Sequence, residues 1–269
     1  MLNKTAVITG ASRGIGREIA LKLDSNGVNI VLAAKSIEEN SKLPGTIFSV
    51  AKEVENLGAK ALPFALDVRS EDSIDEMVQQ AITTFGRIDF VINNAGAIYL
   101  TDTLSTTPKQ YDLMNSINVR ATFLVSRACI KFLKINGGHI LNLSPPISFN
   151  SKWLSGHVAY TMSKFGMSFC TLGMAEEFKE YDIAVNSLWP KTLIFTAAIE
   201  RLMGKDAINS CRTPQIVADA AYWILSQEPS KFTGNLCIDE DIILKSGKNN
   251  LLNYSCNSNS NLVRDLFVD

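Results

Sequence analysis

The stretch Thr9-Gly10-Ala11-Ser12-Arg13-Gly14-Ile15-Gly16 follows the short apolar run Thr5–Ile8 and precedes a segment with helical spacing of apolar residues. A strand, a glycine-rich turn and a helix in this order are typical of an α/β unit that binds a phosphate group. Gly10 permits the tight turn, Gly14 lets the backbone approach a pyrophosphate, and Gly16 lets the helix pack closely on the strand. The free N–H groups at the start of the helix would face the anionic oxygens. The alternative is a purely structural glycine turn.

The rest of the chain repeats this alternation of apolar runs and helix-like segments. Six further runs indicate strands: Val28–Ala34, Lys60–Leu66, Ile88–Ile92, His139–Leu143, Ile183–Leu188 and Leu236–Ile238. Between them, a helix starts near Ser70 and runs to Phe85-Gly86, and Thr213-Pro214 is placed to cap one that reaches Gln227. A long helical region extends from Pro108 to about Lys134. Strands alternating with helices predict an α/β fold with a doubly wound parallel sheet.

The composition excludes several classes of protein. The 269 residues are 46% hydrophobic and 20% charged, as in an ordinary globular protein, and a net charge of −1 gives no reason to expect a nucleic-acid partner. Five scattered cysteines without a Cys-x-x-Cys pair indicate reduced thiols in an intracellular compartment. Only His139 and His157 are histidines, and the spacing of Cys and His predicts no metal site. The absence of a long apolar run predicts no transmembrane segment, and no targeting signal is visible at either end.

Tyr160-Thr161-Met162-Ser163-Lys164 places a tyrosine and a lysine four residues apart, on one face of a helix that begins near Val158. A phenol titrates near ~10, too high for proton exchange at neutral pH. A neighbouring ammonium favours the phenolate and would lower the pKa of Tyr160 into the range needed for acid/base catalysis. Taken alone, the pentapeptide is as consistent with an exposed helix.

The end of the second strand suggests which dinucleotide would bind. Sites that prefer NAD have a carboxylate there that accepts the ribose 2′-hydroxyl, whereas this chain has Lys35, with Arg13 in the glycine loop. Two cations would suit a 2′-phosphate, so we expect NADP(H) rather than NAD. Asp67, before Val68 at the end of the third strand, would accept a hydrogen bond from the adenine amino group or cap the next helix.

The composition changes after Lys248. Nine of the thirteen residues in 249–261 are Asn or Ser, which indicates a poorly ordered linker, and the more apolar 262–269 would dock at a place that the sequence does not reveal. We therefore expect one domain over 1–248 and a linker-like tail over 249–269.

Five motifs in order resemble the short-chain dehydrogenase/reductase family: the glycine loop, Asn93-Asn94-Ala95-Gly96, Asn118, Tyr160 and Lys164. The resemblance covers residues 4 to about 240 and implies a single Rossmann domain with strand order 3-2-1-4-5-6-7 and the active site at the carboxyl ends of the strands. Ser144-Pro145-Pro146, Leu172–Lys179, Leu188–Thr192 and Phe232–Asn235 resemble a subgroup in which a sterol-carrier domain usually follows. This chain ends where the linker to that domain would lie.

The resemblance also implies roles for individual residues. Tyr160 would be the general acid or base, Lys164 would hold the nicotinamide ribose and lower the pKa of Tyr160, and Asn118 would hold a water molecule for proton resupply. The implied dinucleotide-binding residues are Gly10, Ala11, Ser12, Arg13, Gly14, Ile15, Gly16, Lys35, Asp67, Val68, Asn94, Ala95, Gly96, Lys164, Pro190 and Thr192. Related proteins associate through the helices that bear Asn118 and Tyr160, so a homodimer or homotetramer is expected.

Two positions depart from the family pattern. The serine that usually binds the substrate oxygen aligns with Pro145, so Ser144 or Ser148 would have to replace it, or the role is missing. The usual Pro-Gly after the sixth strand is Pro190-Lys191, which places a cation near the nicotinamide end, where it would contact an anionic substrate or face water.

The function expected from these features is NADP(H)-dependent interconversion of a carbonyl and an alcohol on an apolar, lipid-like substrate, in mitochondria or peroxisomes by resemblance. The apolar excursion 193–212 suggests the substrate class. One alternative is an enoyl-CoA reductase in which Lys191, Arg201, Lys205 and Arg212 meet the CoA phosphates. Another is a cofactor-binding sensor or lipid-handling protein with little turnover, which Pro145 would favour.

Overall fold

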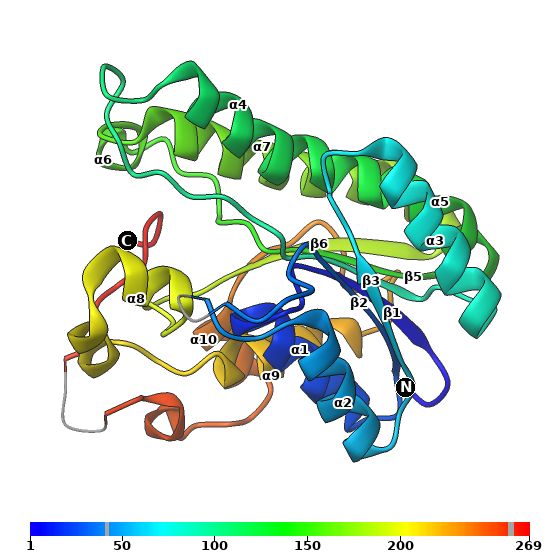
Figure 1. The fold of residues 1–269 in the computed structure, drawn as a ribbon. Helices are drawn as coiled ribbons and strands as arrows, with labels where there is room; N and C mark the ends of the chain where they lie inside the picture. Colours follow the sequence, from blue (N-terminus) through cyan, green and yellow to red (C-terminus); the bar gives the residue numbers. More distant parts are fainter. Residues whose placement is uncertain (41–42, 258–260) are drawn as a thin grey trace.

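A computed structural model describes residues 1–40, 43–257 and 261–269 of the chain (Figure 1). One seven-stranded sheet runs through the molecule in the order β3-β2-β1-β4-β5-β6-β7, and every neighbouring pair is parallel. The strands are β1 Thr5–Thr9, β2 Asn29–Ala34, β3 Ala61–Ala65, β4 Phe90–Asn93, β5 Gly138–Asn142, β6 Ile183–Trp189 and β7 Leu236–Ile238. The predicted fold class and strand order are therefore confirmed.

Helices cover both faces of the sheet, with α1, α2, α9 and α10 on one face and α3, α5 and α7 on the other (Figure 1). The α-helices are α1 Gly14–Asp24, α2 Ile47–Leu57, α3 Glu71–Phe85, α4 Pro108–Asn115, α5 Ala121–Asn136, α6 Ser151–Leu154, α7 Val158–Glu177, α8 Ala197–Met203, α9 Gln215–Leu225 and α10 Asp239–Lys245. Within the described parts of the chain, none of them is both long and apolar enough to cross a membrane.

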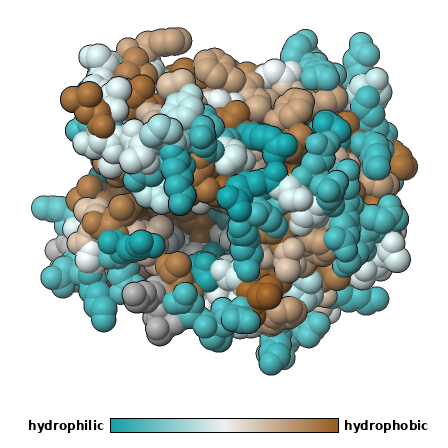
Figure 2. Space-filling view, turned by 45° about the horizontal axis from the view of Figure 1, so that its top comes forward, coloured by the Kyte–Doolittle hydropathy of each residue, from teal (hydrophilic) through white to brown (hydrophobic). Residues whose placement is uncertain are grey.

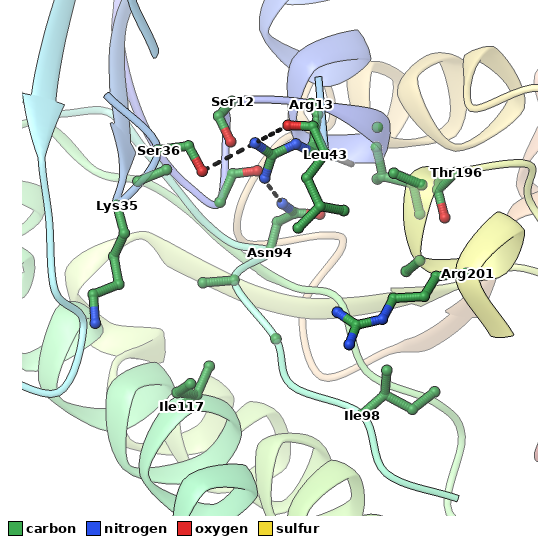
Figure 3. Close-up of a pocket in the computed structure, with 18 of the residues that line it drawn as sticks. Ser12, Arg13, Lys35, Ser36, Leu43, Asn94, Ile98, Ile117, Thr196 and Arg201 are labelled. Atoms are coloured by element: carbon green, nitrogen blue, oxygen red, sulfur yellow. Dashed lines mark hydrogen bonds between the residues drawn. The ribbon is translucent and has the colours of Figure 1, made fainter. Parts of the chain in front are cut away.

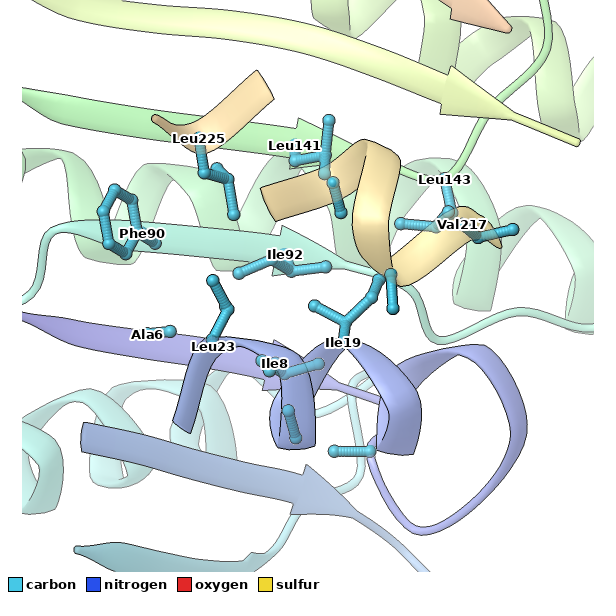
Figure 4. Close-up of a cluster of buried hydrophobic side chains, with 14 of the residues drawn as sticks. Ala6, Ile8, Ile19, Leu23, Phe90, Ile92, Leu141, Leu143, Val217 and Leu225 are labelled. Atoms are coloured by element: carbon cyan, nitrogen blue, oxygen red, sulfur yellow. The ribbon is translucent and has the colours of Figure 1, made fainter. Parts of the chain in front are cut away.

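The side chains of β1 alternate between the two cores. Ile8 packs with Ile19 and Leu23 of α1 and with Val217 of α9 on one face, as Figure 4 shows. Val7 points into the core under α3 and α5. Burial on both faces explains why the strands are continuous apolar runs, and it leaves only the ends of the sheet open to a ligand.

Helix α3 follows Ser70, near where the sequence predicted its start, and Ser70 rather than Asp67 caps it: the Ser70 side chain accepts a hydrogen bond from the backbone N–H of Ser73 at 3.2 Å. The predicted cap of α9 is wrong by one residue, since Pro214 occupies the N-cap position. The reason is that Thr213 donates its backbone N–H to the carbonyl of Tyr254 at 2.7 Å and so continues an extended pairing.

The helical region that begins at Pro108 is not regular. A π-helical turn, Ser116–Arg120, lies between α4 and α5 and carries Asn118 at its centre. A π-helical turn inserts an extra residue into the helix and is frequent at functional sites. Periodicity over a long apolar segment does not reveal this insertion.

The described part of the tail packs on the domain, as predicted for 262–269 but not for 249–257. Tyr254 is buried in the core beneath α9, where its hydroxyl donates a hydrogen bond to Asp219 at 2.7 Å. Phe267 is 2% exposed. Residues 258–260 of the predicted linker, and residues 41–42 of the loop after β2, lie outside the described residues. The Asn/Ser content misled because the few apolar side chains of the tail determine its position.

Candidate active site

The glycine loop between β1 and α1 has no room for side chains. Gly10 has φ of +69°, and a Cβ atom at Gly16 would lie 2.5 Å from Nδ2 of Asn94 and 2.6 Å from the carbonyl oxygen of Gly10. Asn94 holds the loop in place by donating hydrogen bonds to the carbonyls of Thr9 (2.9 Å) and Gly10 (3.1 Å). The backbone of the glycine loop is thus packed against the Asn94 side chain, which follows β4.

The start of α1 is suited to an anionic group. The N-cap residue, Arg13, makes no side-chain hydrogen bond to the first turn, so the N–H groups there have no side-chain acceptor. A cavity of about 780 Å³ lies in front of this turn (Figure 3). It is lined by eleven of the residues predicted to bind the dinucleotide: Gly10, Ser12, Arg13, Gly14, Ile15, Lys35, Asp67, Val68, Asn94, Ala95 and Gly96. The volume of this cavity and the backbone N–H donors at the start of α1 fit a dinucleotide.

The two predicted cations, Arg13 and Lys35, both line this cavity, but each already has protein partners. Arg13 donates to the hydroxyl of Ser36 at 3.0 Å and to the backbone carbonyls of residues 43–45, so it ties the glycine loop to the loop after β2 (Figure 3). Lys35 forms an ion pair with Asp67 at 2.9 Å. Arg69 and Lys35 together hold the pKa of Asp67 well below its usual range. Asp67 does not cap α3, so the capping alternative is removed.

Tyr160 and Lys164 lie one turn apart on α7 and line a second cavity of about 230 Å³. Seven residues line both cavities, which therefore adjoin: Ile15, Asn94, Gly96, Ile98, Thr196, Ala198 and Leu202. Pro190 lines the smaller cavity only. On the side shown in Figure 2, the space-filling surface has a hollow between polar and apolar side chains.

The expected lowering of the pKa of Tyr160 by Lys164 is not what this arrangement produces. Tyr160 is 4% exposed, and burial, together with the nearby carboxylate of Asp265, raises the pKa of its phenol well above the usual value. The Lys164 ammonium instead donates a hydrogen bond to the carbonyl of Leu143 at 2.7 Å, and burial lowers its pKa to about 8. The arrangement therefore holds Tyr160 as a neutral phenol, able to donate a proton.

Asn118 uses its side chain to join three segments. Its Oδ1 accepts a hydrogen bond from the backbone N–H of Ala97 at 2.8 Å, and its Nδ2 donates to the carbonyl of Ala97 at 3.0 Å and to the hydroxyl of Ser163 at 2.8 Å. It thereby ties the loop after β4 to α7, the helix that carries Tyr160 and Lys164. The side chain makes no hydrogen bond to Lys164 in this structure.

The serine expected to contact the substrate is turned away from the cavity. Ser144 is fully buried, its hydroxyl has no hydrogen-bond partner among the described residues, and it lines neither cavity. The carbonyl of Pro145 accepts a hydrogen bond from Ser168 at 2.6 Å, which fixes the backbone there. Ser148 accepts the backbone N–H of Asn150 and also lines neither cavity.

Three further residues that were predicted to bind the dinucleotide, Ala11, Gly16 and Thr192, line neither cavity. Ala11 and Gly16 shape the glycine loop without lining a cavity, and the buried Thr192 pairs with Arg264 of the tail. Lys191 forms an ion pair with Glu240 at 2.7 Å and does not line the smaller cavity, so it does not reach the nicotinamide end.

The structure adds residues that the motifs did not indicate. Asp265 and Leu266 of the tail line the cavity that holds Tyr160, and the Phe267 ring stacks on the Tyr160 ring with centroids 6.1 Å apart. The only signal in the sequence was the apolar composition of 262–269, which predicted docking without a location.

Known proteins with similar sequences or structures agree with this geometry. A family model described as "short chain dehydrogenase" matches residues 4–203. Hydroxysteroid dehydrogenase-like protein 2 is 52% identical in Xenopus tropicalis and 51% identical in Homo sapiens, over 98% of this chain. The chain spans 63% of the length of these relatives.

Two crystal structures are similar over the entire chain. One, from Xanthomonas campestris, is 44% identical with a TM-score of 0.96 and is itself covered over 98% of its length. The other, a short chain dehydrogenase from Mycobacterium thermoresistibile, is 44% identical with a TM-score of 0.95 and is covered over 96%. The family match, the identity to these relatives and the shared fold lead to one conclusion: the chain belongs to the short-chain dehydrogenase/reductase family of oxidoreductases that use NAD or NADP.

Proposed function

We propose that the protein reduces a carbonyl, or oxidises the corresponding alcohol, on an apolar lipid-like substrate with NADP(H). The observation that carries this proposal is the position of Tyr160 and Lys164, in a cavity that adjoins the one in front of the glycine loop. A substrate oxygen beside Tyr160 would therefore lie at the nicotinamide end of a dinucleotide whose phosphates rest on α1.

The proton would come from the chain itself. The bound dinucleotide supplies the hydride that reaches the carbonyl carbon. Tyr160 donates its phenolic proton to the carbonyl oxygen as the C–O double bond becomes single, and the alcohol leaves. Burial keeps the Tyr160 phenol protonated at neutral pH, which is the form that donates the proton in the reduction.

The apolar walls support the lipid-like substrate. Ile98, Ile199, Leu202 and Trp189 line the smaller cavity, whereas Asp265 and Lys164 are its charged groups. The enoyl-CoA alternative loses two of its four cations, because Lys191 and Arg212 both form ion pairs with Glu240 at 2.7 Å, whereas Arg201 lines the larger cavity.

The test is reduction of aliphatic ketones and aldehydes by NADPH with wild-type protein and Tyr160→Phe. Loss of the proton donor should lower kcat by about 10²- to 10⁴-fold while the Kd for NADPH stays within about twofold. If the two proteins turn over equally, Tyr160 is not the donor. If neither turns over any carbonyl but both bind NADPH, the sensor alternative replaces this proposal; Ser144, turned away from the cavity, already favours that alternative.

The preference for NADP rests on Arg13 and Lys35. A crystal structure of a 27% identical short-chain oxidoreductase contains NADP, and one of a 22% identical short chain dehydrogenase contains NAD, so the family uses both. Removing both charges (Arg13→Gln with Lys35→Gln) should raise the Kd for NADPH at least about tenfold and change that for NADH less than about threefold. Lys52→Gln, on the exposed side of α2, is the control. Equal affinity of the wild-type protein for NADPH and NADH would remove the 2′-phosphate argument.

A further inference from the structure

One acidic side chain, Asp265, lines the cavity that holds Tyr160. Its segment pairs in the antiparallel direction with the chain that follows β6, and the backbone N–H of Asp265 donates to the carbonyl of Lys191 at 3.1 Å. Asp265 therefore lies beside Lys191, the residue that follows Pro190. Because Pro190 lines the same cavity, this pairing explains why a carboxylate stands in the cavity wall.

Hydrogen bonds and packing hold this carboxylate in one place. Its Oδ1 accepts the backbone N–H of Leu266 at 2.7 Å. The carbonyl of Leu266 in turn accepts the indole N–H of Trp189 at 2.8 Å, and the Phe267 ring packs on the Trp189 ring with centroids 6.0 Å apart. A group that is fixed in this way before a ligand arrives loses little conformational freedom on binding.

The other oxygen of this carboxylate, Oδ2, accepts no hydrogen bond and forms no ion pair within the described ranges 1–40, 43–257 and 261–269. It is also not among the fully buried polar atoms that lack a partner, so it remains accessible. An ionised carboxylate only accepts hydrogen bonds. Asp265 thus offers an acceptor from the cavity wall to a donor on a ligand.

Lys164, the other charged residue that lines this cavity, does not occupy Asp265. Its ammonium donates to the carbonyl of Leu143 at 2.7 Å, and in the described part of the chain no ion pair joins it to Asp265. Burial raises the pKa of Asp265 to about 6, so the carboxyl group is mostly ionised at pH 7. The cavity therefore presents a negative charge that the protein leaves without a direct partner.

Such a charge between apolar walls favours one kind of ligand. Ile194 and Ile199 line the same cavity as Asp265. An ionised group among apolar side chains has lost part of its hydration, and a hydroxyl that donates to it restores a hydrogen bond. An anionic group in the same place is repelled more strongly than it would be in water. Sites built around a polar group of this kind discriminate strongly against analogues that lack its partner.

We propose that Asp265 determines the substrate specificity of this site: its Oδ2 accepts a hydrogen bond from a hydroxyl group close to the reacting carbonyl, and its charge disfavours an anionic group there. The substrate class is then a hydroxyketone or hydroxyaldehyde with an apolar chain, or the corresponding diol. The inference rests on the proposed carbonyl/alcohol chemistry and adds the group that the substrate carries beside the carbonyl.

The experiment measures kcat/KM with NADPH at pH 7 for 2-octanone, 1-hydroxy-2-octanone and 2-oxooctanoate, which differ at the first carbon only, and for 4-hydroxy-2-octanone. It compares wild-type protein with Asp265→Asn and Asp206→Asn. Asparagine keeps an acceptor for the N–H of Leu266 and replaces Oδ2 by a donor. Asp206, an exposed carboxylate that lines neither cavity, is the matched control.

In Asp265→Asn, kcat/KM for the better hydroxyketone relative to 2-octanone should fall at least about tenfold, and that for 2-oxooctanoate relative to 2-octanone should rise at least about tenfold. Comparing the same ratio between proteins cancels the different reactivities of the carbonyl groups. Asp206→Asn should leave both ratios unchanged. If either ratio in Asp265→Asn stays within about twofold of the wild-type value, the proposal is overturned.

A binding measurement separates this inference from the proposed function. Wild-type protein should bind the better of 1,2- and 2,4-octanediol more tightly than 2-octanol, and Asp265→Asn should reduce this preference at least about tenfold. Tryptophan fluorescence, to which Trp189 in the cavity wall contributes, follows the binding. If the preference changes in this way but no ketone is reduced, the proposed function fails and the role of Asp265 stands. If ketones are reduced but neither the ratios nor the preference change, the role of Asp265 alone fails.

Asp265→Ala serves where the asparagine variant does not fold. It removes the charge and the acceptor together, so both kcat/KM ratios should move in the same directions by at least about threefold. Wild-type ratios in this variant, with thermal unfolding showing that it is folded, would equally overturn the proposal.

Discussion

The Lys164 ammonium donates a hydrogen bond to the carbonyl of Leu143 across 2.7 Å, from a side chain that is buried against the Trp189 ring 5.1 Å away. A charge so placed is costly, which is why burial lowers the pKa of Lys164 to about 8. Lys164, to which we assign a role in the proposed reaction, is thus a residue without which the fold would be more stable.

Lys164→Met should abolish turnover and stabilise the protein at pH 7 by about 1 to 2 kcal/mol. The lowered pKa of Lys164 corresponds to a loss of about 3 kcal/mol in the free energy of unfolding at pH 7. Methionine removes this loss but also removes the hydrogen bond to Leu143, which offsets part of the gain. Relative to Lys164→Met, the wild-type protein should also gain stability from about pH 8 to about pH 10.4, because there the unfolded chain holds the proton that the folded chain has lost. Buried thiols such as Cys129 and Cys237, whose raised pKa values act in the opposite sense, are present in both proteins and cancel in this difference. Urea unfolding across this range measures both effects.

The control for that variant is Lys109→Met, on the exposed side of α4, which should change stability by less than about 0.5 kcal/mol. A Lys164→Met protein that is less stable than wild type at pH 7 would mean that the ammonium contributes net stability where it lies.

Gly16→Ala should lower stability by about 1 to 3 kcal/mol and weaken NADPH binding at least about tenfold. The added Cβ would lie within 2.6 Å of Asn94 and of the Gly10 carbonyl, so the glycine loop must shift. Gly173→Ala, in the exposed face of α7 with open space around it, should instead stabilise by up to about 1 kcal/mol. Thermal unfolding and NADPH fluorescence compare the two; equal effects would contradict the packing argument.

The sequence predicted the seven strands because each is an apolar run bounded by glycine or polar residues, and such local patterns persist in the fold; their order came from the resemblance to the family. Most residues predicted to bind the dinucleotide line one cavity, since the glycine loop, Asn94 and Lys35 follow strands whose carboxyl ends meet at one edge. The partners of these residues were not predictable. That Lys35 pairs with Asp67, and Arg13 with carbonyls of residues 43–45, depends on how loops distant in sequence come together.

The tail shows the same limit more strongly. Its composition predicted poor order over 249–261, yet Tyr254 is buried and bonds to Asp219 of α9. For 262–269 the sequence predicted docking without a location, because the partners of Phe267 lie in β6 and α7, which a local window does not contain. The π-helical turn at Asn118 is a second example, since one inserted residue leaves the apolar periodicity nearly intact.

Asn118→Ala should destabilise the protein by about 2 to 4 kcal/mol, because it leaves the N–H and C=O of Ala97 and the hydroxyl of Ser163 without this partner. Asn115→Ala, one turn earlier and only partly buried, should cost less than about 1 kcal/mol. Repeating the first change in a Ser163→Ala background isolates the Asn118–Ser163 bond. Losses that simply add would contradict coupling between the two side chains.

We propose that the protein forms a homo-oligomer through α5 and α7, whose outer faces expose Phe123, Met162 and Phe169 by 48, 52 and 59%. Light scattering should give a mass of two or four times 29.5 kDa. Phe169→Lys should shift the distribution toward the monomer, whereas Phe149→Lys, at a loop residue 88% exposed, should not. A wild-type monomer at micromolar concentration would contradict the proposal.

His139 should make the protein less stable as the pH falls. Its Nε2 lies 3.1 Å from the carbonyl of Gln227, its Nδ1 is buried without a partner among the described residues, and burial lowers its pKa to about 4. Between about pH 6.5 and pH 4 the unfolded chain therefore binds a proton that the folded chain refuses, and stability falls by about 3 kcal/mol over that window. The loss is complete once the pH passes below the folded-state value.

Buried carboxyl groups act in the opposite sense over part of this range, because burial raises the pKa of Asp239 to about 7 and that of Asp265 to about 6. The difference between wild type and His139→Gln removes their contribution, since both proteins contain them. Glutamine keeps a donor for the Gln227 carbonyl and does not titrate, so its unfolding free energy should fall less steeply below pH 6.5. His157→Gln, at a partly buried histidine, should keep most of the wild-type slope. Parallel curves for His139→Gln and wild type would show that His139 is protonated in the folded protein at the same pH as in the unfolded chain.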